Sequence, residues 1–288
     1  RDLHLSIRRQ RQMCIRDRLN NQSEKLSLKG LKFGAIQVDI SDYILKLTLN
    51  RPDKKNAINQ MMGNELAYCL AFAKQEKNVR VVIIQAKGDV FCSGGDLRTM
   101  SGEDEAKSNV PEIGGGTEEI SLRIRKLNKP VICKIQGSVY AGALLMVTNS
   151  THAIAVKDAT FSAPEIKRGI WPFMVMAGLF RLMPKRQGLD FIMRGRPIDA
   201  MAAKEYGLIN EVVVSDELDE TVAKYANELA NLAPSTMQIG LNAYNAQEDM
   251  DFEDAIPFLK EELAKCLSSE DAKEGITAFL EKRKPNWK

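Results

Sequence analysis

Two glycine-bearing segments lie where a strand pattern gives way to a helix pattern. The first is Ser93-Gly94-Gly95-Asp96, and the second runs from Gly137 to Ala141-Gly142-Ala143. Backbone N–H groups in the first turn of a helix have no partner within that helix. Such groups, together with the helix dipole, stabilise negative charge on a ligand. Either segment alone is more typical of a tight turn that needs glycine, and Asp96 is best interpreted as a helix cap.

A third segment, Ala163-Pro164-Glu165, follows a later strand and supplies a carboxylate. Glutamate is a residue type that accepts and returns protons. On its own, the segment is typical of a helix start, with proline in the first position and an acidic residue in the first turn. The three segments together therefore predict chemistry that depends on backbone dipoles and one carboxylate.

Histidine and cysteine chemistry is disfavoured by number and placement. Of two histidines, His4 lies near the N-terminus and His152 leads into an apolar strand, where packing or surface hydrogen bonding is the expected role. The five cysteines are scattered and never form a CxxC pair. This pattern argues against a zinc ribbon, a redox dithiol and a secreted disulfide framework, and it predicts no metal site.

The elements that must position these residues alternate between strand and helix. Two strands flank a turn at Ser41-Asp42, and a helix is predicted over residues 60–76. Apolar strands at 79–86 and 130–137 have the composition of strands buried on both faces. Further strands and helices follow, including a short helix capped by Asp199; beyond Asp216 the chain is amphipathic helix, with breaks predicted at Pro234 and Pro257. This order predicts an α/β fold with a helical C-terminal segment.

Composition agrees with a globular chain of 288 residues, since 44% are hydrophobic and 27% charged. No run approaches the roughly 18 apolar residues of a membrane-spanning helix. The net charge is +3, but residues 1–30 carry +5 and the rest of the chain −2. The N-terminal 1–30 segment, which contains RRQRQMCIRDR, lacks helix or strand periodicity and is predicted to be a non-native or disordered basic extension. The remainder divides into a core, 31–215, and a C-terminal helical segment, 216–288.

Six segments in order resemble the crotonase (enoyl-CoA hydratase/isomerase) superfamily, over about residues 34–288. They are RPDKKNAIN, VFCSGGDL, KPVICKIQGSVYAGA, ATFSAPEIKRGI, AAKEYGLINEVV and AFLEKRKPNW. The resemblance implies a ββα superhelix with C-terminal helices for oligomerisation, and an acyl-CoA substrate. It also implies that the thioester oxygen meets the backbone N–H groups of Gly95 and Gly142, which stabilise an enolate. Small residues such as Ala141 let the thioester approach the backbone.

One departure from the family pattern bears on the reaction. Hydratases of the family use two glutamates, and the first of these positions is Leu145 here while the second is Glu165. Leucine cannot transfer a proton, so the resemblance points first to a Δ3,Δ2-enoyl-CoA isomerase with Glu165 as single acid/base. Hydration stays open, with Glu118 or Glu119 as a replacement carboxylate. Decarboxylation also stays open, with Tyr140 orienting the leaving carboxylate.

The resemblance further implies residues that hold coenzyme A, which is part of the substrate and the only cofactor-like group expected. Cations suit its phosphates, backbone near Ala57 would meet the adenine, and the bulky Trp171 would shape the acyl pocket. The candidates for substrate binding are Arg51, Lys54, Lys55, Ala57, Ser93, Tyr140, Trp171 and Lys282.

Partners and compartment are expectations of the same kind. The resemblance implies a homotrimer or a dimer of trimers, located in the cytoplasm or, in a eukaryote, in the mitochondrial matrix. The competing non-enzyme hypothesis is a catalytically decayed acyl-CoA- or RNA-binding member of the fold. The net charge of −2 beyond residue 30 argues against nucleic acid as a partner, and the absence of a Ser-His-Asp pattern disfavours a serine peptidase.

Overall fold

The computed structural model describes residues 25–96, 108–113 and 117–287. Its main sheet has six strands in the order β1-β2-β3-β5-β7-β10. β1 pairs antiparallel with β2, and every other neighbouring pair in this sheet is parallel. The strands are β1 Ile36–Ser41, β2 Ile44–Leu49, β3 Val81–Ala86, β5 Val131–Ile135, β7 His152–Val156 and β10 Glu211–Val213.

A second, smaller sheet has the order β4-β6-β8-β9. Its strands are β4 Val90–Cys92, β6 Ser138–Tyr140, β8 Thr160–Ser162 and β9 Ile198–Asp199. β3, β5 and β7 of the main sheet are each followed by a short strand of this second sheet. The chain thereby repeats a strand–strand–helix unit, which is the ββα superhelix that the resemblance implied.

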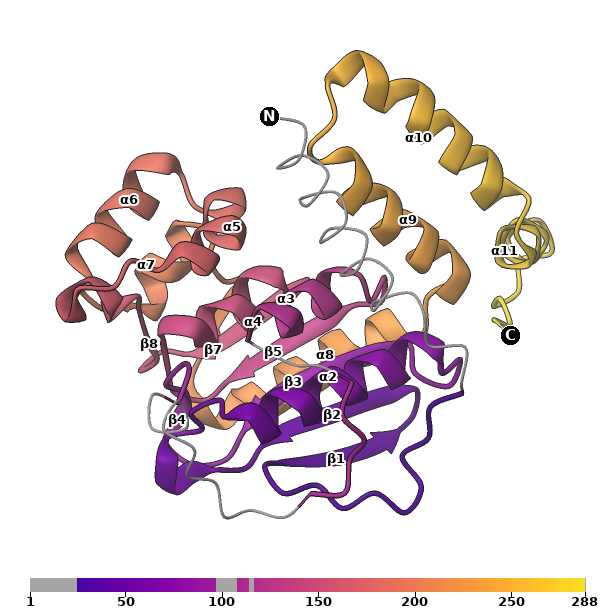
Figure 1. Ribbon diagram of the computed structural model, residues 1–288. Helices are drawn as coiled ribbons and strands as arrows, with labels where there is room; N and C mark the ends of the chain where they lie inside the picture. The colour runs from indigo at the N-terminus through magenta and orange to yellow at the C-terminus, as the bar shows by residue number, and fades with distance from the viewer. Residues whose placement is uncertain (1–24, 97–107, 114–116, 288) are drawn as a thin grey trace, which may run out of the picture.

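The helices after these strand pairs form a row along the main sheet (Figure 1). α2 (Gln60–Gln75) contacts α3 (Thr117–Arg125), which in turn contacts α4 (Leu144–Asn149). α8 (Leu218–Ala230) packs against β3, β5 and β7. Because helices cover the sheet, the first four residues of β3 are all buried, as its apolar sequence predicts.

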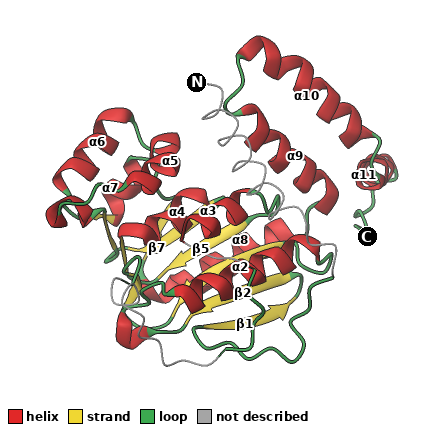
Figure 2. Cartoon of the chain, viewed as in Figure 1, coloured by secondary structure: helices red, strands yellow, loops and turns green. Residues whose placement is uncertain are grey.

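Three shorter helices gather at one end of the molecule, on the left in Figure 2. They are α5 (Phe173–Leu182), α6 (Lys185–Arg194) and α7 (Ala200–Glu205). The Asp199 carboxylate accepts the Ala202 N–H at 2.8 Å, so the predicted cap of α7 is confirmed. No helix in the described residues has the length and apolar character to cross a membrane.

The C-terminal helices α9 (Pro234–Gln247), α10 (Phe252–Leu267) and α11 (Glu270–Leu280) project beyond the sheet (Figure 1). The break predicted at Pro234 is confirmed, since α9 starts there. The break predicted at Pro257 is wrong, because α10 continues through it. Proline removes one backbone donor and disfavours the preceding turn. Here the chain instead turns between α9 and α10, and Pro257 lies within the second turn of α10.

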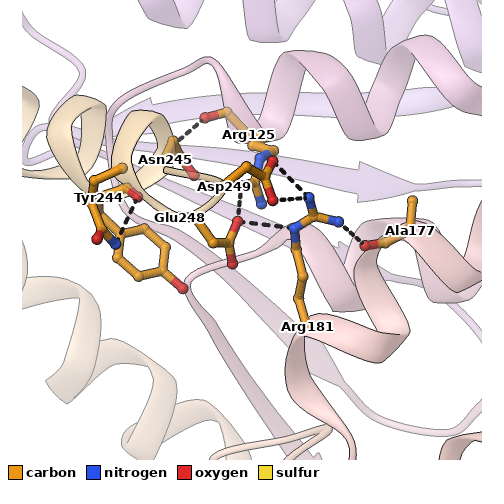
Figure 3. A network of polar contacts seen from close by, with 8 residues as sticks. Arg125, Ala177, Arg181, Tyr244, Asn245, Glu248 and Asp249 are labelled. Atoms are coloured by element: carbon orange, nitrogen blue, oxygen red, sulfur yellow. Dashed lines mark hydrogen bonds and ion pairs between the residues drawn. The ribbon is translucent and has the colours of Figure 1, made fainter. Parts of the chain in front are cut away.

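An ion-pair network fixes the end of α9 to the body of the protein (Figure 3). Glu248 pairs with Arg125 of α3 and, at 3.0 Å, with Arg181 of α5. Arg181 also binds Asp249 through two hydrogen bonds of 2.9 Å. The Asn245 side chain donates to the Arg125 carbonyl at 2.8 Å. These contacts couple α9 to both α3 and α5.

The structure differs from the sequence prediction at the end of the N-terminal extension and at the first turn. Leu26 and Leu28 pack against the core, and the Tyr68 hydroxyl donates to the Ser27 carbonyl at 3.1 Å. The predicted boundary at residue 30 is therefore a few residues late, because these leucines find apolar neighbours; residues 1–24 lie outside the described residues. The first turn is centred on Asp42 and Tyr43, one residue later than predicted, and both have positive φ.

Large apolar side chains of the C-terminal helices face solvent. On α10 these include Phe252, which is 78% exposed, and on α11 they include Phe279, which is 82% exposed. A concentration of exposed apolar side chains on neighbouring helices is typical of an interaction site. The other exposed members are Ile256, Leu263, Leu267, Ile276 and Leu280.

Candidate active site

A pocket of about 850 Å³ opens at the carboxyl ends of β4, β6 and β8. The turns that follow parallel strands meet at one edge of a sheet, so residues distant in sequence come together there. The pocket brings together seven of the predicted site residues, which are Glu165, Gly95, Gly142, Lys55, Ser93, Tyr140 and Trp171.

The first glycine turn directs a backbone donor toward this pocket. The Ile58 N–H donates to the Gly94 carbonyl at 2.8 Å, and the Asp96 N–H donates to the Ile58 carbonyl at 2.9 Å. Gly95 thus forms a parallel bridge with Ile58. Successive N–H groups of an extended chain point to opposite sides. The Gly95 N–H therefore points away from Ile58.

The second glycine turn places a similar donor beside the first. Gly142 lies within the 3-10 helix η3 (Ala141–Ala143), where early N–H groups have no helical partner. A Cβ added to Gly142 would lie 3.5 Å from the Gly95 nitrogen. A Cβ on Gly94, whose φ is +91°, would lie 2.9 Å from the Gly142 nitrogen. The two turns touch, which leaves room only for very small residues.

Ala141 pays a conformational cost in this arrangement. Its φ is +53°, a left-handed conformation that glycine adopts more readily than alanine. An L-residue in this region costs on the order of 1–2 kcal/mol. The Ala141 side chain faces the first turn so closely that a Cβ on Gly94 would lie 2.8 Å from the Ala141 Cβ, so position 94 must be glycine.

Glu165 supplies a carboxylate with an unusual environment. It lies in the 3-10 helix η4 (Pro164–Arg168) directly after β8. Its Oε2 atom is buried and has no hydrogen-bond partner among the described residues. Burial raises the pKa of Glu165, and Arg168 opposes this by its positive charge. A carboxylate with a raised pKa and an oxygen without a hydrogen-bond partner among the described residues suits proton transfer.

Leu145, at the position of the family's first glutamate, faces the same pocket from α4. The replacement carboxylate considered above is not provided by Glu119, whose side chain binds Arg123 at 2.6 Å and does not line the pocket. The side chain of Glu118 lies outside the described residues. Glu165 is consequently the only acidic residue among the described residues that line the pocket.

Four predicted substrate-binding residues do not line the pocket: Lys54, Ala57, Arg51 and Lys282. Arg51 instead donates to the Ala57 carbonyl at 2.5 Å and to the Asp96 carboxylate at 3.0 Å. These contacts tie the loop around η1 (Pro52–Lys54) to the residue after Gly95. Arg51 thus positions the first glycine turn, and its charge is already paired with Asp96. The predicted helix that Asp96 would cap begins outside the described residues, so the cap role stays a prediction.

Tyr140 and Trp171 border the pocket with their polar groups engaged elsewhere. Hydrogen bonding to Ser138, and then to Thr160, lowers the pKa of Tyr140. The Trp171 indole N–H, just before α5, donates to the sulfur of Met176 in the first turn of α5 at 3.1 Å. Phe173 and Met174, the first two residues of α5, line the pocket while remaining largely exposed. The bulky residues after Glu165 therefore do shape the pocket wall.

Histidine chemistry stays outside this site. His152 hydrogen-bonds Thr151 at 2.9 Å and packs edge-on against Tyr225, so its predicted packing role is confirmed. It does not line the pocket. Among residues with described placement, no group of three or more His, Cys, Asp or Glu side chains could hold a metal ion.

The family follows from comparison with known proteins. The model of the family described as enoyl-CoA hydratase/isomerase matches residues 39–288. The chain belongs to the enoyl-CoA hydratase/isomerase family. It is 27% identical to the crystal structure of an enoyl-CoA hydratase from Mycobacterium smegmatis, with a TM-score of 0.81 over 88% of this chain and 98% of that one. The crotonase fold implied by the resemblance is thereby confirmed.

Named relatives in this family are moderately similar to the chain. Carnitinyl-CoA dehydratase of Proteus mirabilis is 32% identical, covering 85% of this chain and 95% of the relative. Mevalonyl-coenzyme A hydratase sidH of Aspergillus fumigatus is 30% identical, covering 85% and 92%. The human enoyl-CoA hydratase domain-containing protein 3, mitochondrial, is 29% identical, covering 85% and 81%.

The structure adds pocket residues that the sequence did not single out. Arg168 and Lys167 line the pocket beside Glu165, and Ser162, Gly195 and Pro197 close another side. The spacing of Arg168, three residues after Glu165, was the available signal, because a 3-10 helix places such residues on the same side. The contributions of Gly195 and Pro197, which lie far along the chain, had no sequence signal.

Proposed function

We propose that this member of the enoyl-CoA hydratase/isomerase family is a Δ3,Δ2-enoyl-CoA isomerase with Glu165 as its single acid/base. The observation that carries the proposal is the pairing of Glu165 with Leu145 in one pocket. One wall offers a carboxylate with a raised pKa, and another offers a side chain that cannot transfer protons. Activation of water by two carboxylates needs a second acidic side chain in the pocket, and none of the described lining residues other than Glu165 supplies one.

The reaction would proceed in two proton transfers. The Glu165 carboxylate takes a proton from C2 of a 3-enoyl thioester, and the electron pair moves into the C1–C2 bond. The resulting dienolate oxygen accepts hydrogen bonds from the N–H groups of Gly95 and Gly142. Glu165 then returns its proton to C4, so the double bond moves from C3–C4 to C2–C3. One oxyanion donor of this kind contributes about 3–4 kcal/mol of transition-state stabilisation.

Hydration of a 2-enoyl-CoA is the second candidate. It is supported by the names of relatives, which include a mevalonyl-coenzyme A hydratase and a carnitinyl-CoA dehydratase. Hydration needs a group to activate water in addition to the oxyanion donors. Tyr140, which borders the pocket, keeps decarboxylation as a third candidate.

Parallel assays with 3-hexenoyl-CoA and 2-hexenoyl-CoA test these alternatives, with the conjugated thioester followed by ultraviolet absorbance. We expect the 3-enoyl ester to gain the conjugated signal, and Glu165→Gln to abolish that gain. Loss of signal from the 2-enoyl ester alone would establish hydration instead. Silence with both esters, despite tight binding of CoA esters, would leave decarboxylation or a binding protein and refute the isomerase.

We further propose that the chain assembles as a homotrimer or a dimer of trimers through its C-terminal helices. The exposed apolar side chains of α10 and α11 support this. Light scattering should give the mass of three or six chains, and a monomer would contradict it. The location proposed is the cytoplasm or, in a eukaryote, the mitochondrial matrix, and the relatives named as mitochondrial support the second. No metal or redox cofactor is expected, since the proposed steps only move a proton.

A further inference from the structure

Positive charge dominates the wall of the active-site pocket. Lys55, Lys167 and Arg168 line it, against Glu165 as the single acidic residue among the described lining residues. Arg168 is exposed and forms no salt bridge within the described part of the chain. Its guanidinium therefore keeps its donors available for a ligand.

Local geometry places Arg168 at the reacting end of the pocket. Glu165 and Arg168 are three residues apart in the 3-10 helix η4. Side chains with this spacing are eclipsed in a 3-10 helix, so both project from the same side. The charge of Arg168 acts on Glu165, where it lowers a pKa that burial raises. Lys167 projects from another side of η4, although it also lines the pocket.

We infer that Arg168 is a specificity-determining residue that binds an anionic group of the bound thioester, and that this group is a carboxylate on the acyl chain. The inference rests on the proposed function, in which Glu165 lies against C2 of the acyl group. A cation on the same side as Glu165 then meets the acyl chain, whereas the phosphates of coenzyme A lie a pantetheine arm away. The guanidinium fork matches a carboxylate with two parallel hydrogen bonds.

Such a substrate would also strengthen the base. A carboxylate bound to Arg168 neutralises the charge that favours ionised Glu165 in the free enzyme. The affinity of Glu165 for a proton then increases when this substrate binds. An uncharged acyl chain would leave Arg168 unpaired beside the base. Arg168 would thus select its substrate in the catalytic step as well as in binding.

Calorimetric binding of two unreactive esters tests the inference without depending on turnover. Glutaryl-CoA carries a terminal carboxylate, and valeryl-CoA is its uncharged counterpart. We expect the native protein to prefer glutaryl-CoA and Arg168→Met to lower that affinity roughly 10- to 100-fold, the size of a charge-assisted hydrogen bond. The affinity for valeryl-CoA should change less than about threefold, because Arg168→Met removes no contact to its uncharged acyl chain. Lys185→Met, which removes an exposed cation at the start of α6 that does not line the pocket, is the matched control and should leave the preference intact.

The two sources of negative charge are separated by repeating the titrations with the pantetheine thioesters, which lack the nucleotide phosphates. If Arg168→Met weakens the binding of S-glutaryl-pantetheine as much as that of glutaryl-CoA, Arg168 binds the acyl carboxylate. If Arg168→Met instead weakens the binding of both CoA esters equally, and does not weaken the binding of the pantetheine thioesters, Arg168 binds a phosphate and the inference is overturned. A native preference for valeryl-CoA, or an Arg168→Met protein that keeps the glutaryl preference, would overturn it too. If the preference for glutaryl-CoA is intact but a 3-enoyl-CoA with a terminal carboxylate, 3-hexenedioyl-CoA, is not isomerised, the proposed function alone is refuted.

Discussion

The contact between the two glycine turns makes Gly142→Ala a sharp test of the oxyanion hole. The added methyl carbon would lie 3.5 Å from the Gly95 nitrogen and 3.9 Å from the Gly94 Cα. Both are ordinary van der Waals distances, so the fold should accept it. An oxyanion must approach the same nitrogen to about 2.9 Å. The methyl therefore competes with the oxyanion for space beside one of its two donors.

The expected cost is that of losing one oxyanion donor, about 10²–10³ in turnover. Stability should not fall, because replacing glycine by alanine in helical backbone gains up to about 1 kcal/mol. The assay is exchange of the C2 protons of butyryl-CoA with solvent deuterium, which requires the base and the oxyanion donors whatever the overall reaction. Thermal unfolding is measured in parallel.

Gly240→Ala is the matched control, since Gly240 lies in α9 and its added Cβ would meet nothing within 4 Å. It should gain comparable stability and exchange protons at the native rate. If Gly142→Ala also keeps more than about a third of the native exchange rate, the N–H groups of Gly95 and Gly142 do not bind the thioester oxygen.

Two further predictions concern single carboxylates. Burial raises the pKa of Glu165, so its ionisation destabilises the fold as pH rises from the unfolded value through the raised native value. Glu165→Gln should therefore raise the melting temperature at pH 8, and this gain should disappear near pH 4. The activity of the native protein should rise with pH over the same range. An equal shift of the melting temperature at pH 4 and pH 8 would contradict a buried charge on Glu165. Glu248→Gln leaves Arg125 and Arg181 with a weaker partner and should cost roughly 1–2 kcal/mol of unfolding free energy, less at high salt. A salt-independent cost, measured by urea unfolding, would exclude the ion pairs as its cause.

The sequence by itself determined the order of the elements and the chemical types at the site. The apolar run of β3 fixes a strand covered by helices, because only a strand buried on both faces tolerates it. Asp199 fixes the start of α7 through a side-chain hydrogen bond to a near neighbour. Glu165 and Leu145 were identified from motifs that lie within a few residues of each. These are local properties, decided by residues close together in the chain.

Only the tertiary structure decided which distant groups meet. The close approach of the two glycine turns depends on the parallel pairing of β4 with β6, which local sequence does not encode. The bridge between Ile58 and Gly95 brings the loop that follows Arg51 to the first turn, and Arg51, expected to bind coenzyme A, pairs with Asp96 instead. Pro257 lies within α10 although a break was predicted there. Long-range contacts of this kind depend on how strands register and helices pack, and these follow from the whole fold.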